Sequence, residues 1–231
     1  MAVSVSGGQA RTAQIDASVA PKGPVTPPVT PKGKATRAKL LAAAGTVFGR
    51  VGYQGTRIAD IVAEAGISHG LFYRHFADKD AILLSVLEQL NEELRRTTGR
   101  AVGEDDTLTL ARLEQRNIHF FEDYRRNRLL LRVAREAAAQ EGDYGFREMW
   151  LQMRDRFVER TRRWLVRLQE SGAVFPLTDT DMIAEGLCAL TEQMAYVQVG
   201  LARCDPDDAT IERLGKASAL IWYRGVTGRA A

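Results

Sequence analysis

The chain has 231 residues and a formal net charge of +3, and 45% of its residues are hydrophobic, 26% charged and 7% aromatic. These values are typical of soluble globular proteins and exclude fibrous, collagen-like and wholly disordered classes. Two cysteines, Cys188 and Cys204, are too few for a disulfide framework or a structural zinc site, so we expect no metal and a cytoplasmic location. The sequence contains no apolar run long enough to predict a membrane span or a signal peptide.

The charges are distributed unevenly along the chain. Residues 1–79 contain ten lysines and arginines against four acids, a net of +6, whereas residues 80–231 contain 22 bases and 25 acids, a net of −3. A basic first third beside an acidic remainder indicates a module that binds a polyanion, joined to a second unit.

Residues 1–33 are expected to form a disordered, basic and proline-rich arm, because five prolines and few large apolar side chains cannot offset the entropy of ordering. Four basic residues lie close together in sequence at the end of this arm and just beyond it. They are Lys32, Lys34, Arg37 and Lys39. This run either touches phosphates or the minor groove of DNA, or is a solvated surface.

From Thr36 onward, apolar residues recur at spacings of three and four, and no segment alternates as a strand would. The sequence therefore predicts an all-α fold of about nine helices. Thr56 and Ser68 are expected to cap the second and third helices, and Gly52 and Gly66 to end the first and second. The predicted helices span 36–50, 57–65, 69–76, 78–99, 107–124, 127–140, 144–170, 180–200 and 207–223.

The second and third helices, joined by the tight turn at residues 66–68, have the spacing of a helix-turn-helix, whose second helix enters the major groove of DNA. Phe72 and Phe76 lie one turn apart and are expected to face inward. The opposite face carries residues that suit base edges and phosphates, namely His69, Gly70, Tyr73 and Arg74. A helix of this length, about 12 Å, reads few base pairs, so function requires two copies.

Residues 55–80 read GTRIADIVAEAGISHGLFYRHFADKD and resemble the N-terminal domain of the TetR family of bacterial transcriptional regulators. The family pattern has a threonine opening the second helix, an Ala-Gly-Val-Ser turn, and Tyr-x-His-Phe-x-x-Lys after it, and residues 36–87 match nearly throughout. Val62, Leu71 and Arg74 depart from the commoner residues, which affects the bases that are read. The resemblance implies a two-domain, all-α, homodimeric repressor that a small molecule releases from operator DNA.

Carried over residue by residue, the resemblance implies a DNA-binding domain at residues 34–80 and a ligand-binding and dimerisation domain at residues 81–231. The implied DNA contacts are Thr56, Arg57, Ser68, His69, Gly70, Tyr73, Arg74, His75 and Lys79. Alternative roles remain open for three of these residues, since His75 could pack on the first helix, Arg57 could be a solvated charge, and Tyr73 could be a core aromatic.

Aromatic and methionine side chains recur at helical spacing in the C-terminal part. Such a stripe usually forms core, but helical bundles also hold ligands between their helices. The candidate effector pocket consists of Phe120, Phe121, Trp150, Met153, Phe157 and Met194. His119, Glu192 and Gln193 could orient a ligand, and the arginines between residues 125 and 135 could attract an acidic effector or form a solvated face.

The last two predicted helices mix small and large apolar residues, which lets helices approach closely. Paired across a twofold axis, they would form a four-helix dimer interface. The candidate interface residues are Leu187, Leu190, Leu214, Ala217, Leu220 and Ile221.

The sequence thus predicts a regulator, most simply a repressor, whose partners are double-stranded operator DNA, a hydrophobic or amphipathic effector and a second copy of the chain, with no membrane. An activator or a ligand-independent DNA binder is the alternative. An all-α enzyme is disfavoured because we find no nucleophile–base pair, HExxH motif, Cys/His cluster or glycine-rich phosphate loop, so no catalytic residues and no cofactor are expected.

Overall fold

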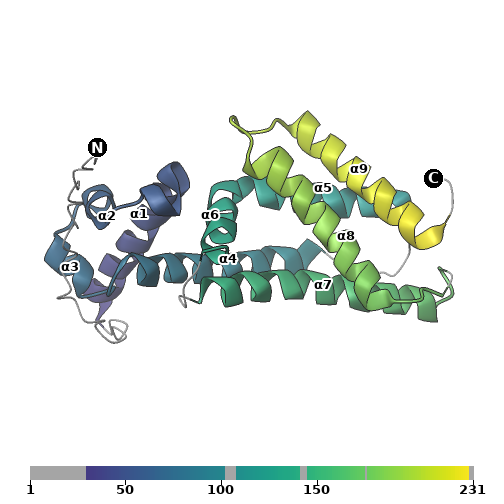
Figure 1. Cartoon of the computed structure of the whole chain (residues 1–231), viewed down its shortest axis with the longest axis horizontal. Coiled ribbons are helices and arrows are strands. Elements are labelled where there is room, and N and C mark those ends of the chain that lie inside the picture. The colour runs from purple at the N-terminus through teal and green to yellow at the C-terminus, as the bar shows by residue number, and fades with distance from the viewer. Residues whose placement is uncertain (1–29, 102–107, 141–144, 175, 229–231) are drawn as a thin grey trace, which may run out of the picture.

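The computed structural model describes residues 30–101, 108–140, 145–174 and 176–228, and every regular element within these ranges is helical (Figure 1). The predicted all-α class is therefore confirmed. The α-helices of the described residues are α1 (Pro31–Gly55), α2 (Ile58–Ala65), α3 (His69–Tyr73), α4 (Lys79–Ala101), α5 (Leu110–Arg126), α6 (Arg128–Ala138), α7 (Phe146–Glu170), α8 (Thr180–Ala195) and α9 (Asp208–Thr227). One π-helical turn, η1 (Tyr196–Gly200), continues α8.

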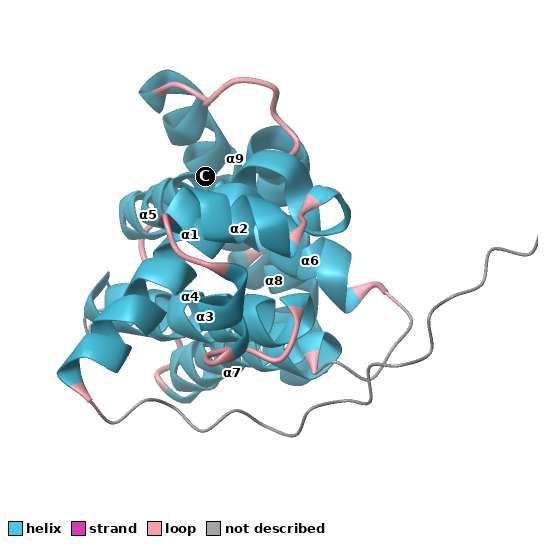
Figure 2. Ribbon diagram, turned by 90° about the vertical axis from the view of Figure 1, so that its left-hand side faces the viewer, coloured by secondary structure: helices cyan, strands magenta, loops and turns pink. Residues whose placement is uncertain are grey.

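The helices form an elongated molecule with the first three at one end. Figure 1 shows α4 and α7 running lengthwise side by side, α6 crossing between the two ends, and α5, α8 and α9 at the end away from α3. Figure 2 looks onto the end formed by α1, α2 and α3. No helix within the described ranges is long and apolar enough to cross a membrane.

Two hydrophobic cores hold these helices together. The first extends from Phe48 of α1 and Phe72 of α3 to Leu131 of α6, so the N-terminal helices share a core with the body of the protein. The second lies among α5, α7, α8 and α9 around Trp164 and Trp222. Burial of large side chains in both cores is the main force that assembles the bundle.

The first helix begins earlier than predicted. Thr30 caps it by accepting a hydrogen bond from Gly33 N at 3.2 Å, and Pro31 occupies the first turn, where its missing N–H is harmless. Thr36 lies within the helix and donates to Lys32 O instead of capping. The expected arm lies outside the described residues except for its last four, and Pro31, Lys32 and Gly33 are helical, not disordered.

The helix-turn-helix also differs locally from the prediction. Arg57, and not Thr56, is the N-cap of α2, and its backbone N–H donates to Asp60 Oδ2 at 3.1 Å. Gly66 ends α2 in the left-handed region at φ 60°, as expected of a C-terminal glycine. The third helix ends at Tyr73 rather than at residue 76, so its five residues span about 8 Å.

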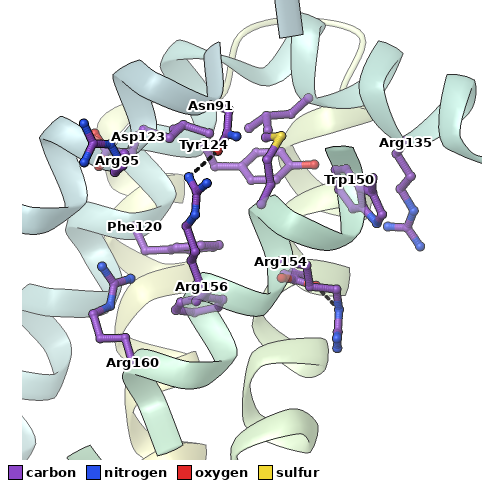
Figure 3. A pocket seen from close by; sticks show the side chains of 15 residues that line it. Asn91, Arg95, Phe120, Asp123, Tyr124, Arg135, Trp150, Arg154, Arg156 and Arg160 are labelled. Atoms are coloured by element: carbon purple, nitrogen blue, oxygen red, sulfur yellow. Dashed lines mark hydrogen bonds and ion pairs between the residues drawn. The ribbon is translucent and has the colours of Figure 1, made fainter. Parts of the chain in front are cut away.

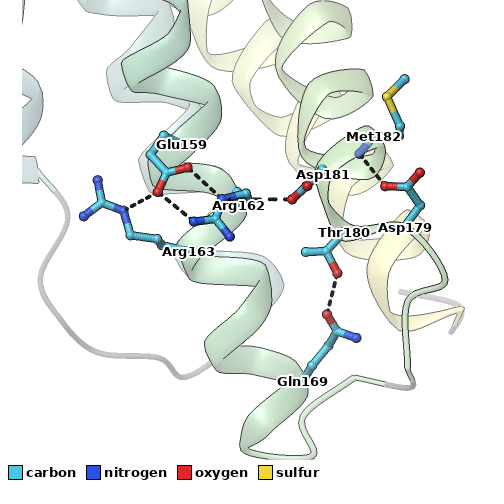
Figure 4. Close-up of polar contacts among 8 residues, drawn as sticks. All are labelled: Glu159, Arg162, Arg163, Gln169, Asp179, Thr180, Asp181 and Met182. Carbon is cyan, nitrogen blue, oxygen red and sulfur yellow. Dashed lines mark hydrogen bonds and ion pairs between the residues drawn. The ribbon is translucent and has the colours of Figure 1, made fainter.

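Polar contacts fix α8 against α7 at the end remote from α3 (Figure 4). Asp179 caps α8 by accepting from Met182 N at 3.0 Å, and Thr180 Oγ1 donates to Gln169 Oε1 at 2.8 Å. Arg162, which pairs with Glu159 on α7 at 2.7 Å, also lies 4.0 Å from Asp181. These contacts position α8 along the outside of α7.

Candidate DNA interface and ligand cavity

The third helix is held by two phenylalanines and presents its other face to solvent. Phe72 is fully buried and Phe76 is 3% exposed, which confirms that both face inward. Ser68 caps the helix by accepting from Leu71 N at 3.3 Å. The exposed residues at this surface are Ser68, His69, Gly70, Tyr73, Arg74 and, from the start of α2, Arg57.

Tyr73 and Gly70 give this surface its shape. The Tyr73 side chain is 44% exposed, and its ring packs edge-on against Phe72 with the centroids 5.3 Å apart. No atom lies within 4 Å of the position that a β carbon at Gly70 would take. A tyrosine hydroxyl and an arginine therefore flank a stretch of open helix backbone, an arrangement that can approach a groove closely.

Three of the residues implied by the resemblance are buried or half-buried, and two of them have hydrogen-bond partners inside the protein. Thr56 is 3% exposed and donates to Gly52 O at 2.7 Å. Lys79 Nζ donates to Tyr53 O at 3.0 Å and lies 4.2 Å from the centre of the Tyr53 ring. His75 is half-buried, its Nδ1 has no hydrogen-bond partner among the described residues, and burial, followed by the charges of Arg74 and Arg37, lowers its pKa.

Of the four basic residues near the start of α1, one makes contacts within the protein and three are exposed. Arg37 donates to Ser85 Oγ at 3.0 Å and stacks 4.8 Å over the ring of Phe76, so it joins α1 to α4 and to the end of the helix-turn-helix. Lys32, Lys34 and Lys39 are exposed. Three cations therefore extend the basic surface of this end of the molecule.

A cavity of about 220 Å³ lies in the body of the protein, among α4, α5, α6, α7 and α8 (Figure 3). Four of the candidate pocket residues line it, namely Phe120, Trp150, Met153 and Phe157. The rings of Phe120 and Phe157 stack with their centroids 5.1 Å apart. Phe121 is fully buried in the first core, and Met194 packs against that core, so neither is among the lining residues.

Polar and charged side chains also line the cavity, and only Arg135 and Glu192 among them were candidates from the sequence. The full polar and charged set is Asn91, Arg95, Asp123, Tyr124, Arg135, Arg154, Arg156, Arg160 and Glu192. The signal that could have revealed three of the others is the placement of Arg154, Arg156 and Arg160 within the aromatic stripe of α7.

Glu192 is the most perturbed carboxyl of the cavity. Its carboxylate lies 3.2 Å from Arg154 Nε, and Arg154 Nη1 is also 2.5 Å from Glu185. Burial raises the pKa of Glu192 to about 7, although the charge of Arg154 opposes that rise. The cavity therefore changes its charge near neutral pH.

Helix α6 connects this cavity to the helix-turn-helix end. Its residues Leu131 and Arg135 line the cavity, while Leu129 packs against Gly49 of α1. At the end of α1, Gln54 Nε2 donates to Gln140 Oε1 at 2.9 Å. A shift of α6 would therefore change both the cavity lining and the contacts that α6 makes with α1.

The candidate dimer residues divide into exposed and half-buried groups. Leu190, Ala217 and Ile221 are exposed, and Leu187, Leu214 and Leu220 are half-buried. The structure adds three exposed apolar side chains on or after α8, namely Met182 at 63%, Val197 at 43% and Leu201 at 49%. Exposed apolar side chains are thus present on α8, on α9 and just after α8, whereas Leu187 and Leu214 pack against the two cores.

Comparison with known sequences identifies the N-terminal helices. Residues 40–86 match the family model described as "Bacterial regulatory proteins, tetR family". The HTH-type transcriptional regulator CymR of Pseudomonas putida is 39% identical over 77 residues, which are 32% of this chain and 38% of that protein. An HTH-type transcriptional repressor of Mycobacterium tuberculosis is 41% identical over 59 residues, 26% of this chain and 31% of its own. The matches thus span less than half of these relatives.

Solved structures extend the likeness in fold to most of the chain. A regulatory protein of the tetR family from Rhodococcus aligns with a TM-score of 0.67 at 19% identity and covers 83% of this chain and 97% of its own. A TetR transcriptional regulator from Chloroflexus aurantiacus aligns with a TM-score of 0.66 at 23% identity, covering 83% and 96%. All of these similar proteins are named as regulators, in agreement with the expectation of a regulator rather than an enzyme.

Proposed function

This chain belongs to the TetR family of bacterial regulatory proteins, and from this premise we propose that it is a cytoplasmic repressor that binds palindromic operator DNA as a homodimer. The exposed face of α3 carries the proposal. Ser68, Gly70, Tyr73 and Arg74 are open to solvent there, while Phe72 fixes the helix to the core. A helix anchored in this way can enter the major groove without rearrangement.

Each polar group of this surface has a distinct role in the proposed complex. Arg74 and Tyr73 read base edges, because a guanidinium and a phenol can donate to bases in the major groove. Arg57, His69 and Ser68 contact the sugar-phosphate backbone of the DNA on either side of these bases. Lys79 uses one of its three hydrogens on Tyr53 O and keeps others for a phosphate, whereas the buried Thr56 and the half-buried His75 support the surface from within.

The dimer follows from the short reach of α3. A helix of about 8 Å contacts only a few base pairs, and two copies related by a twofold axis would place their helices about 34 Å apart on one side of the duplex. The exposed apolar side chains of α8 and α9, including Leu190 and Ile221, supply the surface for this pairing.

The cavity supports regulation by a small effector over ligand-independent binding. It has room for a ligand, and α6 contacts both the cavity lining and α1. Binding that favours a different position of α6 would lower DNA affinity, with a coupling free energy of about 1–3 kcal/mol being typical.

Fluorescence anisotropy with the DNA upstream of the protein's own gene tests the proposal. We expect binding that weakens steeply as salt is raised, with a slope of about −0.9 for each phosphate contact in a plot of log affinity against log salt. Tyr73→Ala and Arg74→Ala should each abolish sequence preference. Arg163→Ala, an exposed arginine on α7, is the control and should bind normally.

Two results would contradict the proposal. One is the absence of binding to the upstream DNA at low salt by the intact protein. The other is normal operator preference in both Tyr73→Ala and Arg74→Ala, which would remove α3 as the reading helix. Sedimentation of each variant confirms that the fold and the dimer are retained.

A further inference from the structure

The lining of the cavity is rich in arginine, and its positive charge is only partly neutralised within the protein. Five arginines and two carboxylates line it. Arg95 is paired with Glu92 at 2.7 Å, and Arg154 with both Glu185 and Glu192. The lining carboxylate of Asp123 is held by Arg126, which lies outside the lining. The two acids are therefore already engaged.

Two other lining arginines donate to neutral amides. Arg156 Nη1 donates to Asn91 Oδ1 at 2.9 Å, and Arg135 Nη2 donates to Gln193 Oε1 at 2.9 Å. Within the described ranges neither makes an ion pair with a carboxylate. An amide oxygen satisfies a donor without neutralising the charge, so both groups, whose hydrogen bonds are exposed, can still pair with an anion.

Arg156 and Arg160 share one face of α7 because they are four residues apart, and like charges at this spacing repel each other. Figure 3 shows both side chains extending from α7 on the side of the cavity where Phe120 lies. Arg160 lies 5.6 Å over the ring of Phe157, and burial lowers its pKa. An anion beside the pair would reduce the repulsion between the two arginines and the cost of burying the Arg160 charge.

A third guanidinium strengthens the positive potential here. Arg116 stacks 4.6 Å over Trp164 and 4.9 Å over Trp222, and no carboxylate of the described residues pairs with it. Burial, followed by the charge of Arg160, lowers the pKa of Arg116 to about 10. The charges of Arg116 and Arg160 thus lie close enough to act on each other at this end of the cavity.

The remaining walls specify an apolar body of limited size. Phe120, Phe157, Trp150 and Met153 provide aromatic and thioether surfaces, which favour flat or flexible hydrocarbon groups. An apolar cavity of about 150 Å³ holds a benzene molecule. The 220 Å³ available here therefore accommodates one ring, or a short alkyl chain, together with a carboxylate.

We propose that the cavity binds a compact organic carboxylate, with the anionic group held by Arg156 and Arg160 and the apolar body against Phe120 and Phe157. This inference rests on the proposed function, in which the same cavity takes the effector. Aromatic acids and short fatty acids share the required chemistry. Neutral amphipathic molecules of the same shape bind more weakly, because they cannot pair their polar group with the charge of Arg156, which donates only to the neutral amide of Asn91.

Matched acid and amide ligands test the proposal on the full-length protein without DNA. Isothermal titration compares 3-phenylpropionate with 3-phenylpropanamide, and hexanoate with hexanamide. We expect at least one acid to bind tenfold or more tightly than its own amide, and the tighter of the two acids shows whether the body is aromatic or aliphatic. If neither acid binds more tightly than its amide, the proposal is overturned.

Variants locate the anionic group. Arg156→Gln should weaken binding of the acid at least tenfold and leave the amide unchanged, while Arg156→Lys should restore part of the preference. Arg163→Gln removes an arginine of the same helix that is not in the lining and should bind as the parent does. Unchanged acid preference in Arg156→Gln would refute this assignment, provided that the unliganded variant melts at the parent temperature.

DNA binding is measured separately by anisotropy, so the two proposals fail independently. Acid-selective binding by a protein that does not bind its upstream DNA would refute the repressor and leave the cavity assignment intact. DNA binding without acid selectivity would refute the cavity assignment and leave the repressor proposal intact.

Discussion

Gly215 of α9 lies directly on the backbone of Ile118 of α5. A β carbon at position 215 would come within 2.6 Å of Ile118 Cα and N, and within 2.4 Å of its Cγ1. Backbone atoms cannot move aside as a side chain does, so glycine is required for this approach of the two helices. One turn away, Ser218 is buried beside Asn117 at 3.5 Å and Thr191 at 3.1 Å, which joins α5, α8 and α9.

Gly215→Ala should therefore destabilise the protein by about 1–3 kcal/mol, because overpacking a tight contact forces helices apart. Gly45→Ala is the matched control in α1, where the nearest atom to a new β carbon is Val86 Cγ1 at 3.9 Å. That variant should gain about 0.5–1 kcal/mol from lower unfolded-state entropy. Urea unfolding of both variants measures the difference, and equal stabilities would contradict the packing argument.

Neighbouring aromatics on α3 should separate stability from DNA binding. Phe72 is fully buried and Tyr73 is 44% exposed. Phe72→Ala should cost about 3–5 kcal/mol of unfolding free energy. Tyr73→Ala should cost far less, because its ring is only partly covered, yet it should lose operator preference. Unfolding and anisotropy on both variants check this, and a large stability loss in Tyr73→Ala would show that the residue belongs to the core.

The local pattern of the sequence was sufficient for the helix-turn-helix but not for its ends. Phe72 and Phe76 were assigned to the core because their spacing is set by the helix itself. The early start of α1 was missed, because a proline-rich composition indicated an arm while the pair Thr30 and Pro31 forms a good N-terminus. Thr56 was assigned as a cap by residue type, although its hydroxyl bonds backward to Gly52.

The cavity depends on how five helices face one another, which the sequence does not state. Phe120 and Phe121 are adjacent and project about 100° apart around α5, so only one of them reaches the cavity. An apolar stripe cannot show which residue that is. Arg154, Arg156 and Arg160 are not among the residues that the sequence singles out, because they line a cavity only once other helices pack against α7.

Glu192 makes the stability of the protein depend on pH. Burial raises its pKa from 4.5 to about 7, so between these values the folded state holds more protons than the unfolded state. This contribution to stability is present below pH 4.5 and falls as pH rises toward 7. Relative to Glu192→Gln, which does not titrate, the parent should lose on the order of 1–3 kcal/mol between pH 4.5 and 8.

Urea unfolding of the parent and of Glu192→Gln across this pH range provides the measurement. Glu88→Gln, which removes an exposed carboxylate of α4, controls for the loss of one negative charge. The parent should differ from Glu192→Gln in its pH profile but not from Glu88→Gln. Parallel profiles for all three proteins would mean that Glu192 is hydrated in solution.

The outer face of α9 should determine the oligomeric state. Ile221 on α9 and Leu151 on α7 are each 45% exposed, so they offer equal apolar area to solvent. In the proposed dimer, Ile221→Glu places two buried carboxylates across the twofold axis, where desolvation and like charge oppose association. Sedimentation equilibrium should show dimer affinity reduced at least tenfold, and operator affinity should fall with it. Leu151→Glu should remain dimeric, and a dimer equally weakened by both substitutions would move the interface away from α9.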